Sequence, residues 1–316
     1  MEDKSFYKVH ENNLSNISSC FLKLSYAQEQ KICDIAEIAR DVSDYVISLL
    51  SDGLSSYEAL SVIGEGMSLG MLPEFSESLN ENIRHLELYF KLTDTFDKAV
   101  FSTLLLEYLA HKGSVICENG FFMSKPQDET FVYVKNSFSD EAFDVFSQDF
   151  QDPRIRYAGS FKEAVRLVNE NAVGYCLLPI EERGVRIPTV EELIFRTDSK
   201  INSVIPVFGL DGNANLKYAL VSKNIIISDY FEDDDRYFEI RIPTDSDSLS
   251  SLIVCAEELG VKVFRINTLS FNTEDGDYTY FSVVLKSMGE DFTKLLVFLT
   301  LFLPEYIPVG IYKNLE

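Results

Sequence analysis

The chain has 316 residues, of which 46% are hydrophobic and 13% aromatic, and its formal net charge at pH 7 is −23. This length and composition predict a folded protein of two or three domains, each burying its own core. The excess of carboxylates excludes nucleic acid and anionic membrane surfaces as partners, because both need clustered lysine and arginine. Scattered cysteines without a Cys-x-x-Cys pair, and an acidic N-terminus with no apolar stretch behind it, predict reduced thiols and a cytoplasmic location.

Residues 1–128 carry the spacing of helices. Apolar side chains recur every three or four residues across Ile32–Leu50, and further helices are expected at Ser78–Leu92 and Asp97–His111. The glycine-rich stretch Gly64–Pro73 is expected to be a plain loop, because no strand precedes it. No family pattern is found in this segment, which is predicted to be a helical domain of unknown family.

Residues 129–229 alternate strands and helices, which predicts βα units and a largely parallel sheet. The expected elements are, in chain order, Phe131–Lys135, Asp140–Phe150, Ile155–Tyr157, Phe161–Asn169, Gly174–Pro179, Thr189–Phe195, Ser203–Phe208 and Lys217–Ser222.

Residues 230–316 predict strand, helix, strand, strand, helix and strand. The expected elements are Tyr237–Ile242, Ser248–Leu259, Val261–Phe271, Tyr278–Lys286, Phe292–Leu303 and Glu305–Tyr312. The fold class is therefore α/β and α+β in a multidomain chain.

Three motifs of the middle segment come in a characteristic order: Ser137–Phe143 after the first strand, Gly159–Val165 at a helix start, and Gly174–Glu182 in a buried strand. This order resembles that of prephenate dehydratases, and the βαββαβ order after it resembles their regulatory ACT domain. The resemblance covers residues 131–316. It implies one lobe of a periplasmic-binding-like fold, without room for the second lobe, followed by a ferredoxin-like ACT domain.

The resemblance also implies the site residues. Prephenate dehydratases use the Thr and Arg of a Thr-Arg-Phe motif as acid and anion clamp, and an Asn after Pro-Ile-Glu as a donor. Here Leu216 stands in the place of the Thr, Lys217 in that of the Arg, and Glu182 in that of the Asn, directly after Glu181. An ionised Glu182 repels a dicarboxylate and donates no hydrogen bond. Thr189 also matches the family, and we interpret it as a helix N-cap.

Ligand-binding positions are implied in two places. Ser139 matches a retained serine of the first helix, and we interpret it as a helix cap. In the ACT domain, Asp247, Ser248 and Leu249 occupy the positions where relatives bind phenylalanine through Gly-Ala-Leu. Because glycine lets a ligand approach the backbone, its absence favours a domain that pairs into a homodimer over one that senses an amino acid. A small carboxylate or amino-acid ligand remains an open possibility.

No cofactor is expected, and no metal, because His10, His85 and His111 share no ligand spacing. Two functions remain open. The first is an impaired relative of the phenylalanine-biosynthetic dehydratases, kept as a binding or regulatory scaffold. The second is an active carbon–oxygen lyase that converts prephenate to phenylpyruvate, water and CO2, with the N-terminal segment supplying the missing wall of the site.

Overall fold

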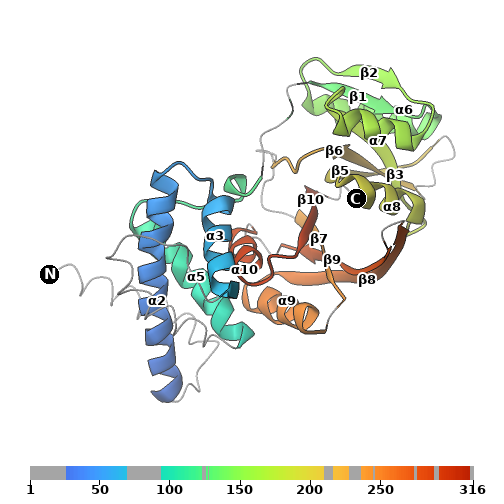
Figure 1. The fold of residues 1–316 in the computed structure, drawn as a ribbon. Helices are drawn as coiled ribbons and strands as arrows, with labels where there is room; N and C mark the ends of the chain where they lie inside the picture. The colour runs from blue at the N-terminus through green and yellow to red at the C-terminus, as the bar shows by residue number, and fades with distance from the viewer. Residues whose placement is uncertain are drawn as a thin grey trace.

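The computed structural model describes residues 26–69, 94–122, 126, 128–209, 216–227, 236–244, 246–273, 276–287 and 292–313. The helix expected at Ser78–Leu92 lies outside these residues, as do His10 and His85. Figure 1 shows the described elements along the chain. None of the helices found there combines the length and the apolar character needed to cross a membrane.

The N-terminal helices are α2 (Tyr26–Ser51), α3 (Ser56–Leu69) and α5 (Thr95–His111). The predicted helices at Ile32–Leu50 and Asp97–His111 are thus confirmed. The loop predicted from Gly64 is wrong as far as Leu69, because these residues continue α3.

The middle segment contains strands and helices in the expected order. They are β1 (Thr130–Tyr133), α6 (Ser137–Phe146), β2 (Arg154–Tyr157), α7 (Phe161–Asn169), β3 (Tyr175–Glu182), β4 (Val185–Arg186), α8 (Pro188–Thr197), β5 (Lys200–Val207) and β6 (Leu216–Ser222). Two short 3-10 helices, η1 (Glu118–Gly120) and η2 (Ser147–Asp149), precede β1 and follow α6.

The C-terminal segment has the βαββαβ order predicted from the sequence. Its elements are β7 (Arg236–Pro243), α9 (Ser246–Glu258), β8 (Lys262–Thr273), β9 (Gly276–Lys286), α10 (Thr293–Phe302) and β10 (Ile307–Lys313).

The strands of the described residues join into one sheet in the order β2-β1-β3-β6-β5-β10-β7-β9-β8, with β4 beside β3. β1 runs parallel to β2 and β3, whereas β6 is antiparallel to both β3 and β5. The prediction of a largely parallel sheet in the middle segment is therefore wrong beyond β3. The reason is that the short connection from β5 to β6 reverses the chain, whereas a parallel pair needs a longer crossover. A parallel contact of β10 with β5 joins the middle and C-terminal segments.

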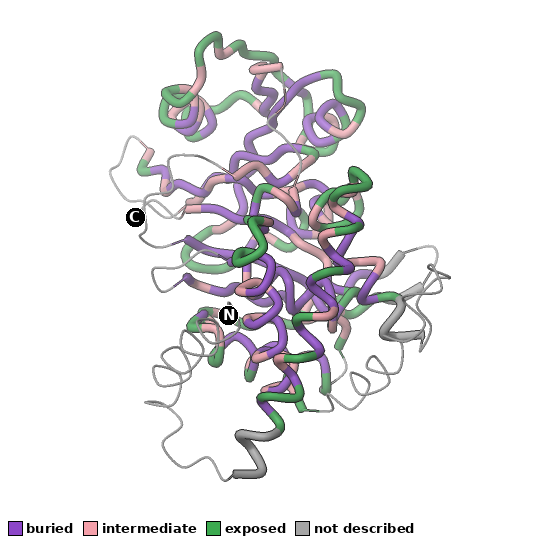
Figure 2. The backbone as a smooth tube through the Cα atoms, turned by 90° about the vertical axis from the view of Figure 1, so that its left-hand side faces the viewer, coloured by how far each residue is buried: buried purple, intermediate pink, exposed green. Residues whose placement is uncertain are grey.

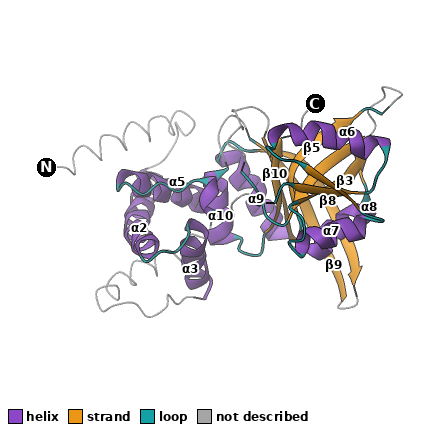
Figure 3. Cartoon of the chain, turned by 90° about the horizontal axis from the view of Figure 1, so that it is seen from above, coloured by secondary structure: helices purple, strands orange, loops and turns teal. Residues whose placement is uncertain are grey.

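The molecule is built in layers. Seen from above, α2, α3 and α5 lie on one side of α9 and α10, and the sheet lies on the other, as Figure 3 shows. One hydrophobic cluster runs through all of these elements, from α2 to the helix-covered face of β7 and β9. Two further clusters cover the opposite faces of the middle sheet, one under α7 and α8 and the other under α6. Buried backbone therefore forms a continuous interior (Figure 2).

Gly64 explains why a glycine-rich segment continues as a helix. A Cβ at this position would lie 2.8 Å from the Thr300 carbonyl oxygen of α10. The glycine therefore permits close contact between α3 and α10, and it marks a helix crossing instead of a turn.

Replacing Gly64 by alanine tests this contact. At an exposed helical position this change stabilises by about 1 kcal/mol. Here we expect the free energy of unfolding to fall by roughly 1–3 kcal/mol, because the added methyl group overpacks the crossing. Urea denaturation measures it, with Ser61→Ala in the same helix as a control expected within about 0.5 kcal/mol of wild type. A more stable Gly64→Ala protein would contradict the close contact.

Candidate functional site

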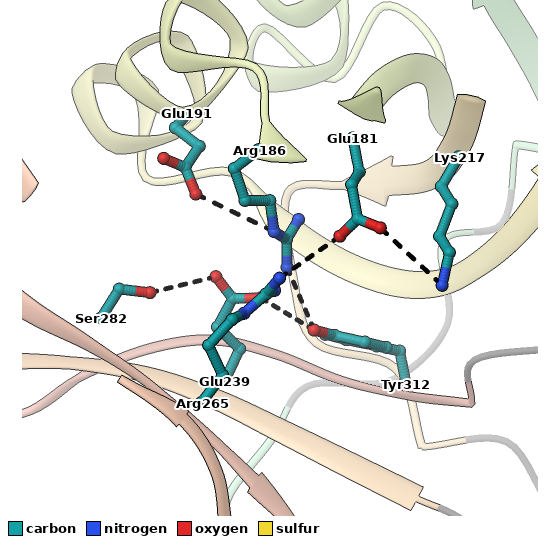
Figure 4. A network of polar contacts seen from close by, with 8 residues as sticks. All are labelled: Glu181, Arg186, Glu191, Lys217, Glu239, Arg265, Ser282 and Tyr312. Atoms are coloured by element: carbon teal, nitrogen blue, oxygen red, sulfur yellow. Dashed lines mark hydrogen bonds and ion pairs between the residues drawn. The ribbon is translucent and has the colours of Figure 1, made fainter. Parts of the chain in front are cut away.

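Two adjacent strands bring together four of the residues expected at the site. β3 and β6 run antiparallel, with Glu181 opposite Lys217 and Glu182 opposite Leu216. The Nζ of Lys217 lies 3.9 Å from Oε1 of Glu181. Arg265, on β8, places Nη1 3.3 Å from the other carboxylate oxygen, Oε2. Glu181 therefore lies between two cations, as Figure 4 shows.

Thr189 is not the N-cap predicted from the sequence. Helix α8 begins with Ile187 at the N-cap position and Pro188 at the first helical position, so Thr189 lies inside the first turn. Proline fits there because its missing N–H has no helical acceptor in the first turn. Glu192, three residues after Thr189, pairs with Arg196 one turn later.

The residues expected to bind a ligand lie elsewhere in the fold. Ser139 is the third residue of α6, where its hydroxyl accepts from the N–H of Asn136, and its own N–H donates to the Asn136 side chain, both at 2.9 Å. It therefore contributes to a helix cap, as interpreted. Asp247–Leu249 lie in the first turns of α9, where the buried Ser248 places its hydroxyl 3.5 Å from Oε1 of Glu305. The cap of Asn136 and Ser139 lies beside β6, where the Tyr218 hydroxyl donates to the Asn136 side chain at 3.5 Å. Neither Ser139 nor Asp247–Leu249 has a described hydrogen bond or ion pair to Glu181 or Lys217.

A second set of polar side chains, not predicted from the sequence, lies beside Glu181. Arg186 of β4 donates through Nη2 to Oε2 of Glu239 on β7. The same oxygen accepts a hydrogen bond of 2.8 Å from the hydroxyl of Tyr312 on β10, and Oε1 accepts one of 3.4 Å from Ser282. The Nε of Arg186 lies 3.9 Å from Oε1 of Glu191 on α8. All five side chains are buried.

We call the residues of Figure 4 the Glu239 network: Glu181, Arg186, Glu191, Lys217, Glu239, Arg265, Ser282 and Tyr312. It joins β3, β4, β6 and α8 of the middle segment to β7, β8, β9 and β10 of the C-terminal segment.

Burial and charge act in opposite directions within the network. Burial alone raises the pKa of Glu239, but the Arg186 charge and the Tyr312 hydrogen bond outweigh it, so this pKa lies below its ordinary value. At Glu191, the effect of burial is larger than the opposing effect of the more distant Arg186 charge, so the pKa of Glu191 is raised. Burial and the charge of Glu239 raise the pKa of Tyr312, which therefore keeps its proton. Glu239 is the ionised centre of the network at neutral pH.

The charges of the network are paired with one another among the described residues. Leu216 carries no hydroxyl, and the buried Tyr312 hydroxyl already donates to Glu239. Lys217 and Arg265 are paired with the chain's own carboxylate Glu181. A dicarboxylate would therefore have to displace an internal anion to reach these cations. Within the described residues, no group of three or more His, Cys, Asp or Glu side chains is placed to hold a metal ion.

Neither a protein-family model nor a curated protein matches the chain. Among solved structures, prephenate dehydratase from Streptococcus mutans matches with a TM-score of 0.46 at 13% identity, covering 59% of this chain and 99% of that one. Prephenate dehydratase from Arthrobacter aurescens, in complex with L-Phe, matches with a TM-score of 0.45 at 12% identity, covering 58% and 90%.

A third solved structure, GqqA, described as a novel type of quorum quenching acylase, has a TM-score of 0.43 at 12% identity and covers 58% of this chain and 95% of its own. The likeness is to a distant prephenate dehydratase-like fold. At this low similarity, only the residues of this chain can support an argument about the chemistry of the site.

The sequence of the strand Arg236–Pro243 contains a pattern that points to the buried charges of the Glu239 network. Alternation places Tyr237, Glu239 and Arg241 on one face of this strand and Phe238 and its apolar neighbours on the other. Every residue from Arg236 to Ile242 is buried, so the charged face must be covered by partners. Nothing in the spacing shows that the partner is Arg186, some fifty residues earlier in the chain.

Glu239→Gln tests the electrostatic role of the network. The variant leaves Arg186 buried without its anion, so we expect the free energy of unfolding at pH 7 to fall by roughly 3–5 kcal/mol. Folding lowers the pKa of Glu239. The stabilisation that Glu239 contributes is therefore fully present at pH values above its unfolded-state pKa, near 4.5, and is lost as the pH falls through its lower folded-state pKa. The difference in free energy of unfolding between wild type and Glu239→Gln should therefore narrow below about pH 4.5.

Denaturation at a series of pH values measures this difference. Glu170→Gln serves as the control, because it breaks an exposed pair with Arg166 and should cost less than about 1 kcal/mol. An equal loss for both variants, or a Glu239→Gln difference that is constant down to acid pH, would show that the Arg186 pair is not stabilising.

Proposed function

We propose that the chain is a prephenate dehydratase-like protein without dehydratase activity, kept as a cytoplasmic binding or regulatory scaffold related to phenylalanine biosynthesis. One observation carries the proposal: at the matched positions, Glu182 faces Leu216, and Glu181 is paired with Lys217 and Arg265. The acid is replaced by a hydrocarbon, the amide donor by a carboxylate, and the anion clamp is filled by an internal anion.

Two further features support the scaffold over the alternative of an active, rearranged enzyme. Between β3 and β6 the described chain contains β4, α8 and β5, with little room for a second lobe. The N-terminal helices, which would have to supply the missing wall, pack on α9 and α10 through their shared hydrophobic cluster. That packing directs them toward the C-terminal segment.

Activity toward prephenate tests the proposal. We expect purified protein to form no phenylpyruvate above the blank, measured by absorbance. We also expect the triple variant Leu216→Thr, Lys217→Arg and Glu182→Asn to remain inactive, because restored side chains do not replace the second lobe. A prephenate dehydratase assayed in parallel is the positive control. Turnover by the wild-type chain at a rate comparable to that enzyme would refute the scaffold.

We further propose that residues 230–316 act as an ACT-like module that forms a homodimer. β8 lies at the end of the sheet and pairs only with β9 among the described strands. This edge strand carries half-exposed apolar side chains, Phe264 at 52% and Ile266 at 39% exposure, and Val254 of α9 is 40% exposed. A long apolar edge strand of this kind favours pairing with another chain.

Sedimentation equilibrium of the full chain tests the dimer. We expect Ile266→Lys to weaken self-association at least about tenfold, because it places a charge at the proposed seam. Val185→Lys, an equally large change at an exposed strand position in β4, should leave association unchanged. If the wild type is monomeric, or if both variants associate like wild type, the proposed interface is wrong.

A further inference from the structure

Arg241 is a buried cation without a carboxylate partner among the described residues. It lies on β7 two residues after Glu239, on the same face of the sheet, and only 3% of it is exposed. Its Nε has no hydrogen-bond partner, and no carboxylate of the described residues lies within ion-pair distance. The guanidinium instead lies 5.3 Å from the ring centre of Phe195 on α8 and 6.0 Å from that of Phe271 on β8.

A lone buried guanidinium is costly, because the charge loses its hydration without gaining an anion. Contact with aromatic rings offsets this cost only in part. Burial outweighs the more distant carboxylates of Glu239 and Glu191 and lowers the pKa of Arg241. Within the described part of the chain, Arg241 therefore holds a buried positive charge that no ion pair neutralises.

The described carboxylates that act on Arg241 each have another cation closer to them. Glu239 is paired with Arg186, and Asp198 is paired with Lys200. Glu191 lies 3.9 Å from the Nε of Arg186. None of the three forms an ion pair with Arg241.

The side chains around Arg241 indicate which kind of anion would fit beside its guanidinium. Phe195 and Phe271 stack with their ring centres 4.4 Å apart, and Tyr280 lies 5.3 Å from Phe195, which gives an apolar surface beside the guanidinium. The planar fork of a guanidinium matches the two oxygens of a carboxylate. The side chain of Arg265, on the same face of the sheet, is 27% exposed, so solvent reaches this face at β8.

We propose that Arg241 anchors a binding site for a small monocarboxylate between α8 and strands β7 and β8, with the Phe195–Phe271 stack beside the ligand's carbon atoms. The site uses neither Leu216 nor Glu182. It therefore goes beyond the proposed function and holds whether or not the chain converts prephenate.

Thermal unfolding of the full chain tests the site with acetate as the probe. Sodium acetate is titrated against sodium chloride at equal ionic strength, which separates specific binding from screening. We expect a saturable rise of the wild-type midpoint in acetate, because a ligand of the folded state stabilises it by mass action. Arg241→Met should abolish this rise while remaining at least as stable as wild type in chloride, since methionine retains the apolar contacts and removes the unpaired charge.

Arg166→Gln is the matched control. It removes one positive charge from an exposed pair and should respond to acetate like wild type. Should Arg241→Met fail to fold, Arg265→Gln decides the question. Calorimetry should then show acetate affinity reduced at least about tenfold, the effect of losing one charged hydrogen bond or its field.

Three outcomes would overturn the proposal. The first is an equal acetate response in wild type and Arg241→Met, or no saturable response in either. The second is unchanged acetate affinity in Arg265→Gln when Arg241→Met does not fold. The third is stronger stabilisation by inorganic phosphate than by acetate, which would assign the site to a dianion. Assay of prephenate turnover is separate, so failure of the dehydratase proposal and failure of this site are told apart.

Discussion

The contact between Arg186 and Glu239 holds two parts of the chain in one fixed relation. A buried ion pair repays its desolvation only when geometry is good and the remaining lone pairs are satisfied. Here Tyr312 and Ser282 donate to the same carboxylate. Because Arg186 belongs to the β4 hairpin and Glu239 to β7, the middle and C-terminal segments cannot separate without breaking this ion pair and its hydrogen bonds.

The backbone supports the same seam. β5 and β10 approach so closely at Ile201 and Gly310 that a Cβ on the glycine would clash with the Ile201 carbonyl oxygen. Lys200 donates to the Pro308 carbonyl oxygen at 2.8 Å. Charged side chains and a close backbone contact thus join the middle and C-terminal parts of one sheet.

The order of elements was predictable because apolar periodicity is local, and it identified every strand of the C-terminal segment within a few residues. Long-range relations were not predictable. The direction of β6, the crossing of α3 at Gly64 and the partner of Glu239 all depend on residues far away in the sequence. The prediction that Thr189 is a helix N-cap was wrong for a local reason. Pro188 takes the first helical position, so the N-cap is Ile187.

The candidate site was predictable in part for the same reason. Glu181, Glu182, Leu216 and Lys217 were located by their motif, and the antiparallel pairing of β3 and β6 brings them together. The arginines that complete the charge pattern come from β4, β7 and β8, and only the three-dimensional fold shows that they converge.

The shared hydrophobic cluster has a consequence for synthesis. α2, α3 and α5 share their interior with α9 and α10, which are made later than the middle segment. About 180 residues separate the end of α5 from the start of α10, so at 5–20 residues per second roughly 9–36 seconds pass before this core can close. During that interval the apolar faces of the first helices lack their covering, and the nascent chain offers them to chaperones.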